Sequence, residues 1–283
     1  MNRPEFYHLE SSVTTEYSES SKISSSITNT YDDFTGYLKL QTTTNSKGQV
    51  IENKTYYPDD VTGVTSLEGG NLSSSEYTAI QRLKNGAAEH RLGQPIQQET
   101  YVDGTLTAIQ RTNFSTENNI TLPSSVEAIY QDTTLQERLT YHDYDNYGNP
   151  LEVSQADGSH TMYIWGYNGQ YPIAKIENAS YTGITTSASD IIEAIKTTSN
   201  DENSQTEETA LRGVFNNLRN EAYFQNAMIT TYTYDPLVGV TSITDPKGYT
   251  TYYEYDEFQR LKTVKDAEGH LISTNEYNYK SQN

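Results

Sequence analysis

Carboxylates outnumber cationic groups two to one in this sequence, with 38 Asp and Glu residues against 19 Lys and Arg. Asp245 and Asp256 could form a carboxylate pair of the kind that glycosidases use for acid and base catalysis. Both residues, however, lie at positions that recur along the chain: Asp266 repeats the place of Asp245, and Asp256 belongs to a recurring Tyr-Asp pair. Recurrence is expected of a scaffold, whereas an active site would interrupt it. We therefore expect no catalytic residues and no enzyme.

The spacing of the possible ligand residues in the sequence gives little support for a metal or cofactor site. The segment that begins at Asp143 starts like a calcium loop, but Ser154 stands where a bidentate Glu is needed. The chain has no Cys, which excludes thiol catalysis, disulfides and Cys-ligated zinc. The histidines show no metal-binding spacing and lie among polar residues; they are His8, His90, His142, His160 and His270. We expect no metal site and no cofactor.

The charge limits the partners. A formal net charge of −19 would repel nucleic acid and anionic membranes, which bind proteins through Lys and Arg. No segment approaches 18 consecutive apolar residues, and the N-terminus lacks the apolar stretch of a signal peptide. We expect no nucleic-acid partner, no membrane span and no export signal within this chain.

Composition favours β-structure. The 25 Tyr residues supply large apolar rings with a polar tip, and the abundant Thr is β-branched, so both suit strands that are partly hydrated. Two segments have the alternation and turn residues of hairpins, one around Asn45–Gly48 and one around Asp103-Gly104. The second has the dipeptide typical of a type I′ turn.

A repeat of about 21 residues organises the rest of the chain. Tyr144 is followed by Trp165 at 21 residues, Tyr234 by Tyr255 at 21, and Tyr255 by Tyr277 at 22. At offset 9 stand apolar residues, which are Val153, Ile243 and Val264. At offset 14 stand glycines, which are Gly158, Gly248 and Gly269. The pattern predicts one hairpin per repeat, with an inward apolar residue and a glycine turn, stabilised by stacking on neighbouring hairpins.

One segment departs from this period. Ile191, Ile192 and Ile195, and then Leu211, Phe215 and Leu218 within a second group, are spaced as on one face of a helix. We therefore expect a two-helix insertion near residues 187–224 that docks on the sheet or on a partner.

The Tyr-Asp pairs and their glycine turns resemble the Rhs/YD-repeat family, in particular its Bacteroidetes-type proteins. The residues that carry this resemblance are Tyr144-Asp145 with Gly148, Tyr234-Asp235, and Tyr255-Asp256 with Arg260-Leu261. The resemblance implies a mainly β fold of stacked antiparallel hairpins that form part of a spiral sheet or shell. In toxin members of the family, such a shell encloses a C-terminal toxic domain. Nothing here resembles the Rhs core segment with its self-cleavage site, so we expect a fragment that lacks the core and the toxin.

The expected organisation has four parts: degenerate hairpin repeats over 1–137, a YD-repeat block over 138–183, the helical insertion over 184–226 and a second YD-repeat block over 227–283. The expected function is that of a shell segment in a polymorphic-toxin or surface assembly, secreted or at the cell surface. Its expected partners are the remaining repeats and the core or toxin domain of a larger polypeptide.

The alternative function is carbohydrate binding at the cell surface, with glycans as partners. Trp165, Tyr167 and Tyr171 lie close together in the sequence and could stack on sugar rings. A shell wall predicts that these rings are packed into the sheet, where cross-strand aromatic pairs stabilise it. A sugar-binding site predicts that they form an exposed platform.

Overall fold

The computed structural model describes residues 8–18, 21–130, 134–200 and 205–277. The chain divides into two compact units, Met1–Tyr141 and His142–Asn283. Both are built from antiparallel strands, and within each unit the order of the strands in the sheet is their order in the chain. Among the described residues, no helix is both long and apolar enough to cross a membrane.

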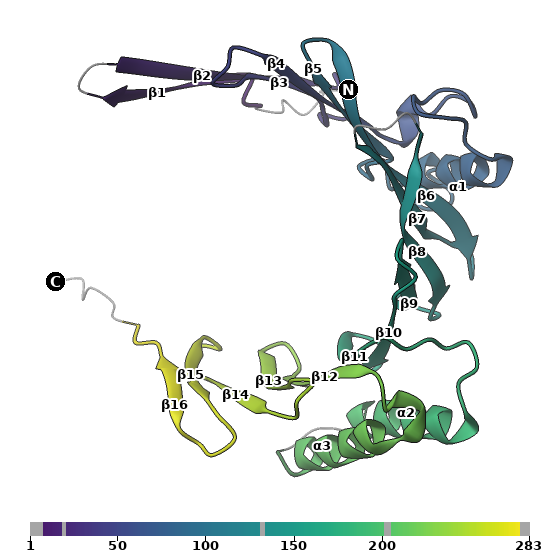
Figure 1. The fold of residues 1–283 in the computed structure, drawn as a ribbon, viewed down its shortest axis with the longest axis vertical. Helices are drawn as coiled ribbons and strands as arrows, with labels where there is room; N and C mark the ends of the chain where they lie inside the picture. Colours follow the sequence, from purple (N-terminus) through teal and green to yellow (C-terminus); the bar gives the residue numbers. More distant parts are fainter. Residues whose placement is uncertain (1–7, 19–20, 131–133, 201–204, 278–283) are drawn as a thin grey trace. The chain divides into compact units, whose positions relative to one another are not determined.

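The described residues of the first unit form eight strands, one α-helix and a short 3-10 helix; Figure 1 labels the strands and the α-helix. In chain order these are β1 (Ser11–Ser18), β2 (Ser21–Tyr31), β3 (Leu38–Thr44), β4 (Val50–Tyr56), η1 (Pro58–Asp60), α1 (Ser74–Lys84), β5 (Gln97–Val102), β6 (Thr105–Glu117), β7 (Ile120–Tyr130) and β8 (Gln136–Tyr144). The end of β8 belongs to the second unit.

Both hairpins predicted in this unit are confirmed. Gly48 connects β3 and β4 with a φ of +80°. Asp103 and Gly104 form the two-residue connection between β5 and β6, with φ values of +49° and +76°. Positive φ at both central residues is what a type I′ turn requires.

Helix α1 was not predicted, and it interrupts the hairpin character expected over 1–137. Ser73 caps it by accepting a hydrogen bond from the backbone N–H of Glu76, whose carboxylate accepts one from the backbone N–H of Ser73. This capping box fixes where the helix begins. The helix buries Ile80 and Leu83 in a core that also contains Phe114 of β6.

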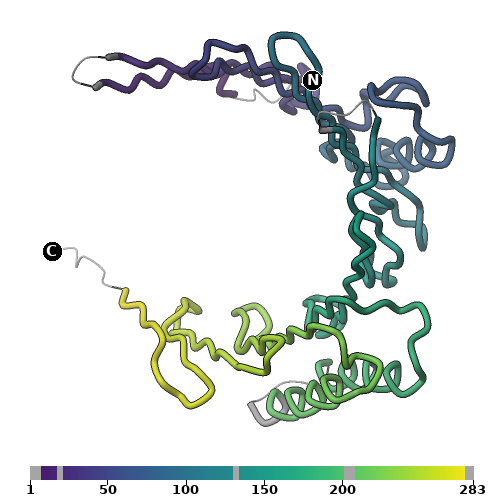
Figure 2. Tube along the Cα trace, viewed as in Figure 1, coloured from purple at the N-terminus to yellow at the C-terminus, as the bar shows by residue number. Residues whose placement is uncertain are grey.

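The second unit holds the predicted insertion between two groups of strands. Its elements are β9 (Pro150–Gln155), β10 (His160–Gly166), β11 (Tyr171–Glu177), α2 (Thr186–Asn200), α3 (Gln205–Asn220), η2 (Ala222–Phe224), β12 (Met228–Asp235), β13 (Gly239–Thr244), β14 (Thr250–Tyr255), β15 (Leu261–Lys265) and β16 (Leu271–Thr274). Figure 2 shows the trace leaving the strands after β11, passing through the two helices and returning at β12. The insertion therefore leaves the strand order intact, because β11 pairs directly with β12.

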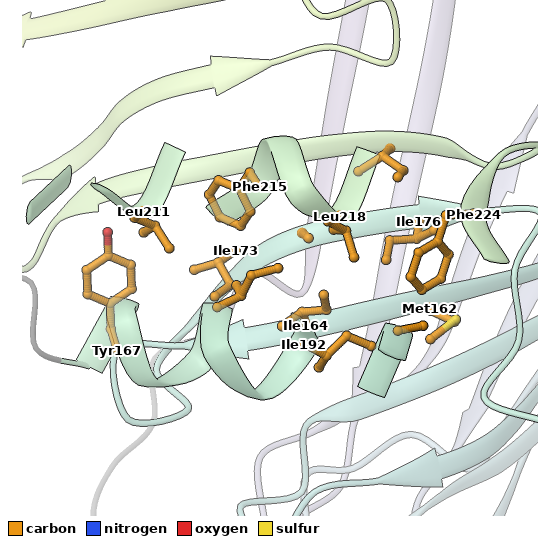
Figure 3. Close-up of a cluster of buried hydrophobic side chains, with 14 residues drawn as sticks. Met162, Ile164, Tyr167, Ile173, Ile176, Ile192, Leu211, Phe215, Leu218 and Phe224 are labelled. Atoms are coloured by element: carbon orange, nitrogen blue, oxygen red, sulfur yellow. The ribbon is translucent and has the colours of Figure 1, made fainter. Parts of the chain in front are cut away.

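The insertion docks on the sheet, as predicted, and forms a hydrophobic core with it. Figure 3 shows side chains of α2 and α3, including Ile192, Leu211 and Leu218, meeting Met162 and Ile164 of β10. The side chains of Met162 and Ile164 are fully buried. Such burial is worth about 1.5–3 kcal/mol for each large aliphatic side chain.

The expectation of inward apolar residues at offset 9 is wrong in detail. Val153 and Ile243 are only half-buried, whereas Glu152 and Ser154 on either side of Val153 are buried, as is Ser242. Alternate residues of a strand point to opposite faces. The more deeply covered face of β9 and β13 is therefore polar, which an apolar pattern cannot reveal.

Candidate functional site

One turn recurs along both units and accounts for the repeated acidic positions. In each example an Asx side-chain Oδ1 accepts hydrogen bonds from the backbone N–H groups two and four residues later, at 2.7–3.1 Å. The turns begin at Asn45, Asp145, Asp245, Asp256 and Asp266. Because these side-chain oxygens accept hydrogen bonds from backbone donors, they stabilise the turn.

The residue three positions after the Asx has a left-handed backbone in every one of these turns. It is glycine in four of them: Gly48, Gly148, Gly248 and Gly269, with φ values of +80° to +88°. Gln259 takes this place after Asp256, with a φ of +60°. Gly148 donates its backbone N–H to the carbonyl three residues earlier, that of Asp145. Gly158 donates in the same way to the Gln155 carbonyl at 2.9 Å, and it has a φ of +82°. The Tyr-Asp turn and the turn at offset 14 thus share one geometry.

Asp235 begins a different turn. There Leu237 has the positive φ, at +68°, and Val238 donates to the Asp235 carbonyl at 3.0 Å. Gly239 follows, and a Cβ at this position would overlap the ring of Tyr255. The left-handed residue of this turn therefore lies two positions after the aspartate, not three.

Several aromatic residues, among them those of the 21-residue repeat, make a hydrogen bond that we call the aromatic latch. In each latch the ring N–H or O–H donates to a backbone carbonyl at least 15 residues earlier. The latches of the second unit are Trp165 to Pro150 (2.9 Å), Tyr234 to Pro172 (2.9 Å), Tyr255 to Val240 (2.9 Å) and Tyr277 to Leu261 (3.0 Å). In the first unit Tyr31 and Tyr57 donate to Leu9 and Leu38 in the same way. Each latch ties a strand to the preceding hairpin.

Local strand irregularities aim several of these rings. The register shifts immediately before Tyr31, Trp165, Tyr234 and Tyr255. An extra residue in one strand of an antiparallel pair redirects the side chains beside it. The recurring aromatic is thus turned back towards the carbonyl that it contacts.

The hydroxyl groups of Tyr234 and Tyr255 have raised pKa values. Burial, helped by the neighbouring Tyr232 and Tyr171 phenols, raises the pKa of Tyr234 to about 12. Burial also raises the pKa of Tyr255, with a contribution from Tyr253. A raised phenol pKa keeps the proton that the latch donates.

The rings named as sugar-stacking candidates are brought together only in part, and they are engaged in packing. Tyr167 is 4% exposed and meets Tyr171 edge to face, with ring centres 5.7 Å apart. Tyr171 stacks on Tyr234 at 4.7 Å and accepts a hydrogen bond from the Leu237 backbone. Trp165 occupies the place of the recurring tyrosine and makes its latch. These contacts are those that a wall of packed hairpins requires.

Helix α3 and the strands beside it border a groove of about 750 Å³, which we call the α3 groove. The groove is lined by both charge types and by tyrosines, among them Glu208, Arg212, Tyr252 and Lys265. Glu208 accepts hydrogen bonds from Arg212 at 2.5 Å and from Thr241 at 2.7 Å. Its carboxylate therefore connects α3 to β13 through these hydrogen bonds.

Sequence reasoning missed one cluster of ionisable side chains. His142, Glu152 and His160 come from three successive strands and offer ligand atoms that all lie within 4.8 Å of one another. Their separation in the sequence matches no metal-binding motif. The alternation of the strands and the hairpin register together bring them to one face.

One known protein family matches part of this chain. Residues 238–271, which span β13 to the start of β16, match the RHS repeat family. No curated protein matches the sequence.

Several solved structures of toxin complexes are similar to the chain at low identity. The TcdB2-TccC3-Cdc42 structure has a TM-score of 0.40 and 11% identity, over 92% of this chain and 11% of that one. TcdB2-TccC3 without its hypervariable C-terminal region has a TM-score of 0.34 and 11% identity, over 85% and 12%. A Photorhabdus luminescens Tc holotoxin pore has a TM-score of 0.33 and 12% identity, over 89% and 12%. This chain therefore spans about an eighth or less of the length of each.

Proposed function

We propose that this chain, which is an RHS-repeat protein, forms a segment of the wall of a shell that encloses a polypeptide cargo in a secreted or surface assembly. The observation that carries this proposal is the order of the strands. In each unit every strand pairs with its neighbours in the chain, so the hairpins add along one direction. Such an arrangement extends by adding further hairpins and suits a wall.

The two faces of the helix-backed strands support this role. One face of β10 and β11 is covered by α2 and α3, and it carries the apolar core. The residues that alternate with that core belong to the other face, among them Tyr163 on β10, Lys175 on β11 and Tyr232 on β12, and all three are half-exposed. We call this second surface the open face. A shell wall needs one apolar, buried face for its own stability and one polar face that can contact the cargo.

The charge also suits a polypeptide cargo. A formal net charge of −19 disfavours binding of nucleic acid to this chain, but it can attract basic segments of a protein. The hydroxyl-rich open face offers hydrogen bonds without a deep apolar site, so it would contact a cargo without holding it tightly. We expect the cargo to be a further domain of the same polypeptide or a bound partner.

Site-specific photo-crosslinking in the protein isolated from its producing cell tests this function. A photo-reactive amino acid in place of Tyr232 reports on the open face, and one in place of Glu193, whose side chain is 67% exposed on α2, is the matched control. We expect cargo peptides to be crosslinked from Tyr232 and not from Glu193. Crosslinks of equal yield from both positions, or glycan rather than peptide adducts at Tyr232, would overturn the proposal.

A further inference from the structure

A cluster of two histidines and a buried glutamate lies on one face of three successive strands in the second unit. His142 is near the end of β8, Glu152 and Ser154 are two residues apart on β9, and His160 is on β10. His160 is paired with Ser154 in the sheet register. Residues two apart in a strand share a face, so the hairpin places these side chains together.

The four side chains already contact one another. His160 Nδ1 lies 2.6 Å from Glu152 Oε1, and His142 Nε2 lies 2.7 Å from the Ser154 hydroxyl. The two imidazole rings are stacked with their centres 5.0 Å apart. Two imidazoles bound to one tetrahedral ion, with bonds of about 2.0–2.1 Å, have ring centres roughly 5 Å apart. The separation of the ring centres is therefore compatible with two imidazoles on one ion.

Glu152 is held in place by hydrogen bonds from the segment that follows β11. It is 3% exposed, and its carboxylate accepts hydrogen bonds from the Ser180 hydroxyl and the Tyr181 backbone N–H, both at 2.7 Å. The cluster therefore combines one fixed carboxylate oxygen with two imidazole nitrogens.

We propose that His142, Glu152 and His160 bind a divalent transition-metal ion, with Zn²⁺ as the first candidate. Two imidazoles and one carboxylate form a ligand set that Zn²⁺ uses, and a fourth position can be taken by water or by Ser154. Ligand atoms around a tetrahedral ion are about 3.3 Å apart, and those of this cluster lie within 4.8 Å of one another, so small movements of the side chains would form the site. His142 is exposed and can rotate, whereas Glu152 is fixed and already ordered by the groups behind it.

Metal binding at this place would have a structural consequence. The ion would connect β8, β9 and β10, and through the hydrogen bonds of Glu152 it would also fix the segment that leads from β11 to α2. Groups that hydrogen-bond a ligating carboxylate orient it and add to the affinity for the metal. We therefore expect the ion to raise the stability of the second unit.

Calorimetric titration of the untagged full chain with Zn²⁺ tests the proposal, with Co²⁺ absorption as a second readout of coordination geometry. We expect one ion per chain, and binding at least about 10-fold weaker in His142→Ala and in His160→Ala. The control is His270→Ala, which removes the histidine from the other close group, with Asp266 and Glu268, and should leave binding unchanged.

A folding check keeps the outcome interpretable. His142 is exposed, so His142→Ala should retain the circular dichroism of the parent chain. Zn²⁺ should raise the melting temperature of the parent and of His270→Ala, but not of His142→Ala. Absence of saturable binding in the parent, or binding that survives His142→Ala and His160→Ala, would overturn the proposal.

Discussion

Strands β10–β12 and strands β13–β16 of the second unit are built from the same hairpins but are stabilised differently. The first group is backed by α2 and α3 and shares with them a core in which Ile164, Ile173 and Phe215 are at most 2% exposed. In the second group no large apolar side chain of the described residues is fully buried, and β16 is exposed throughout. Its strands are held by their backbone pairing, by turns and aromatic latches, and at β13 by polar contacts with α3 such as that of Thr241 with Glu208.

The difference shows what the repeat by itself provides. Turn geometry and latches fix the register of each hairpin, but each contributes only on the order of 1 kcal/mol. A dry core contributes several times more, because a single large side chain is worth about 1.5–3 kcal/mol when buried. The insertion thus supplies the buried apolar core that stabilises β10–β12. Strands without helices must be stabilised by pairing with neighbouring strands.

The largest expected effect comes from the helix-backed core. Phe215→Ala should lower the free energy of unfolding by about 3–5 kcal/mol, because it leaves a cavity between α3 and the sheet. Trp165, the chain's single tryptophan, lies on β10 and can report urea unfolding of this unit by fluorescence. Asn217→Ala on the exposed face of α3 is the control and should change stability by less than about 0.5 kcal/mol. Equal effects of the two variants would mean that the helices do not stabilise the strands.

A smaller effect is expected at the recurring turn. Gly248→Ala should destabilise the chain by about 1–2 kcal/mol, because a φ of +88° is strained for any residue with a Cβ even though open space surrounds it. Gly213 in α3 also has open space but no positive φ, so Gly213→Ala should stabilise by about 0.5–1 kcal/mol. Far-UV circular dichroism during urea unfolding measures both. The account of the turn is wrong if the two changes have the same sign.

The smallest effect should come from one aromatic latch. Tyr255→Phe keeps the ring and removes the hydrogen bond to the Val240 carbonyl, so we expect a loss of about 0.5–1.5 kcal/mol. Tyr249→Phe changes a ring that is 71% exposed and should be nearly neutral. Amide hydrogen exchange in β13 and β14 is the measurement. If β13 is equally protected in both variants, the latch has no role in holding the hairpins together.

Much of the fold could be predicted from local signals. Tyr144, Tyr234 and Tyr255 gave the period, and Gly158, Gly248 and Gly269 gave the turns, because a positive φ restricts the residue type. The helical insertion was visible because its apolar residues keep a 3.6-residue period. Helix α1 was missed, although Ser73 and Glu76 form a recognisable capping box before Ile80 and Leu83.

The polar clusters could not be predicted because they depend on register. His142, Glu152 and His160 meet only after β8, β9 and β10 pair, and the sequence shows them as isolated polar residues. The apolar residue at offset 9 was also misleading, since Val153 lies between the two buried polar residues of β9. A periodic pattern indicates which residues alternate, but the docking of the insertion decides which face is covered.

Native-state hydrogen exchange of the isolated chain tests the central claim most directly. The account predicts that amides of β10–β12 exchange only through unfolding of the unit, while those of β14–β16 exchange by local opening at far lower free energy. Protection that is uniform from β10 through β16 would contradict it, because the strands without helices would then be stable without further neighbours.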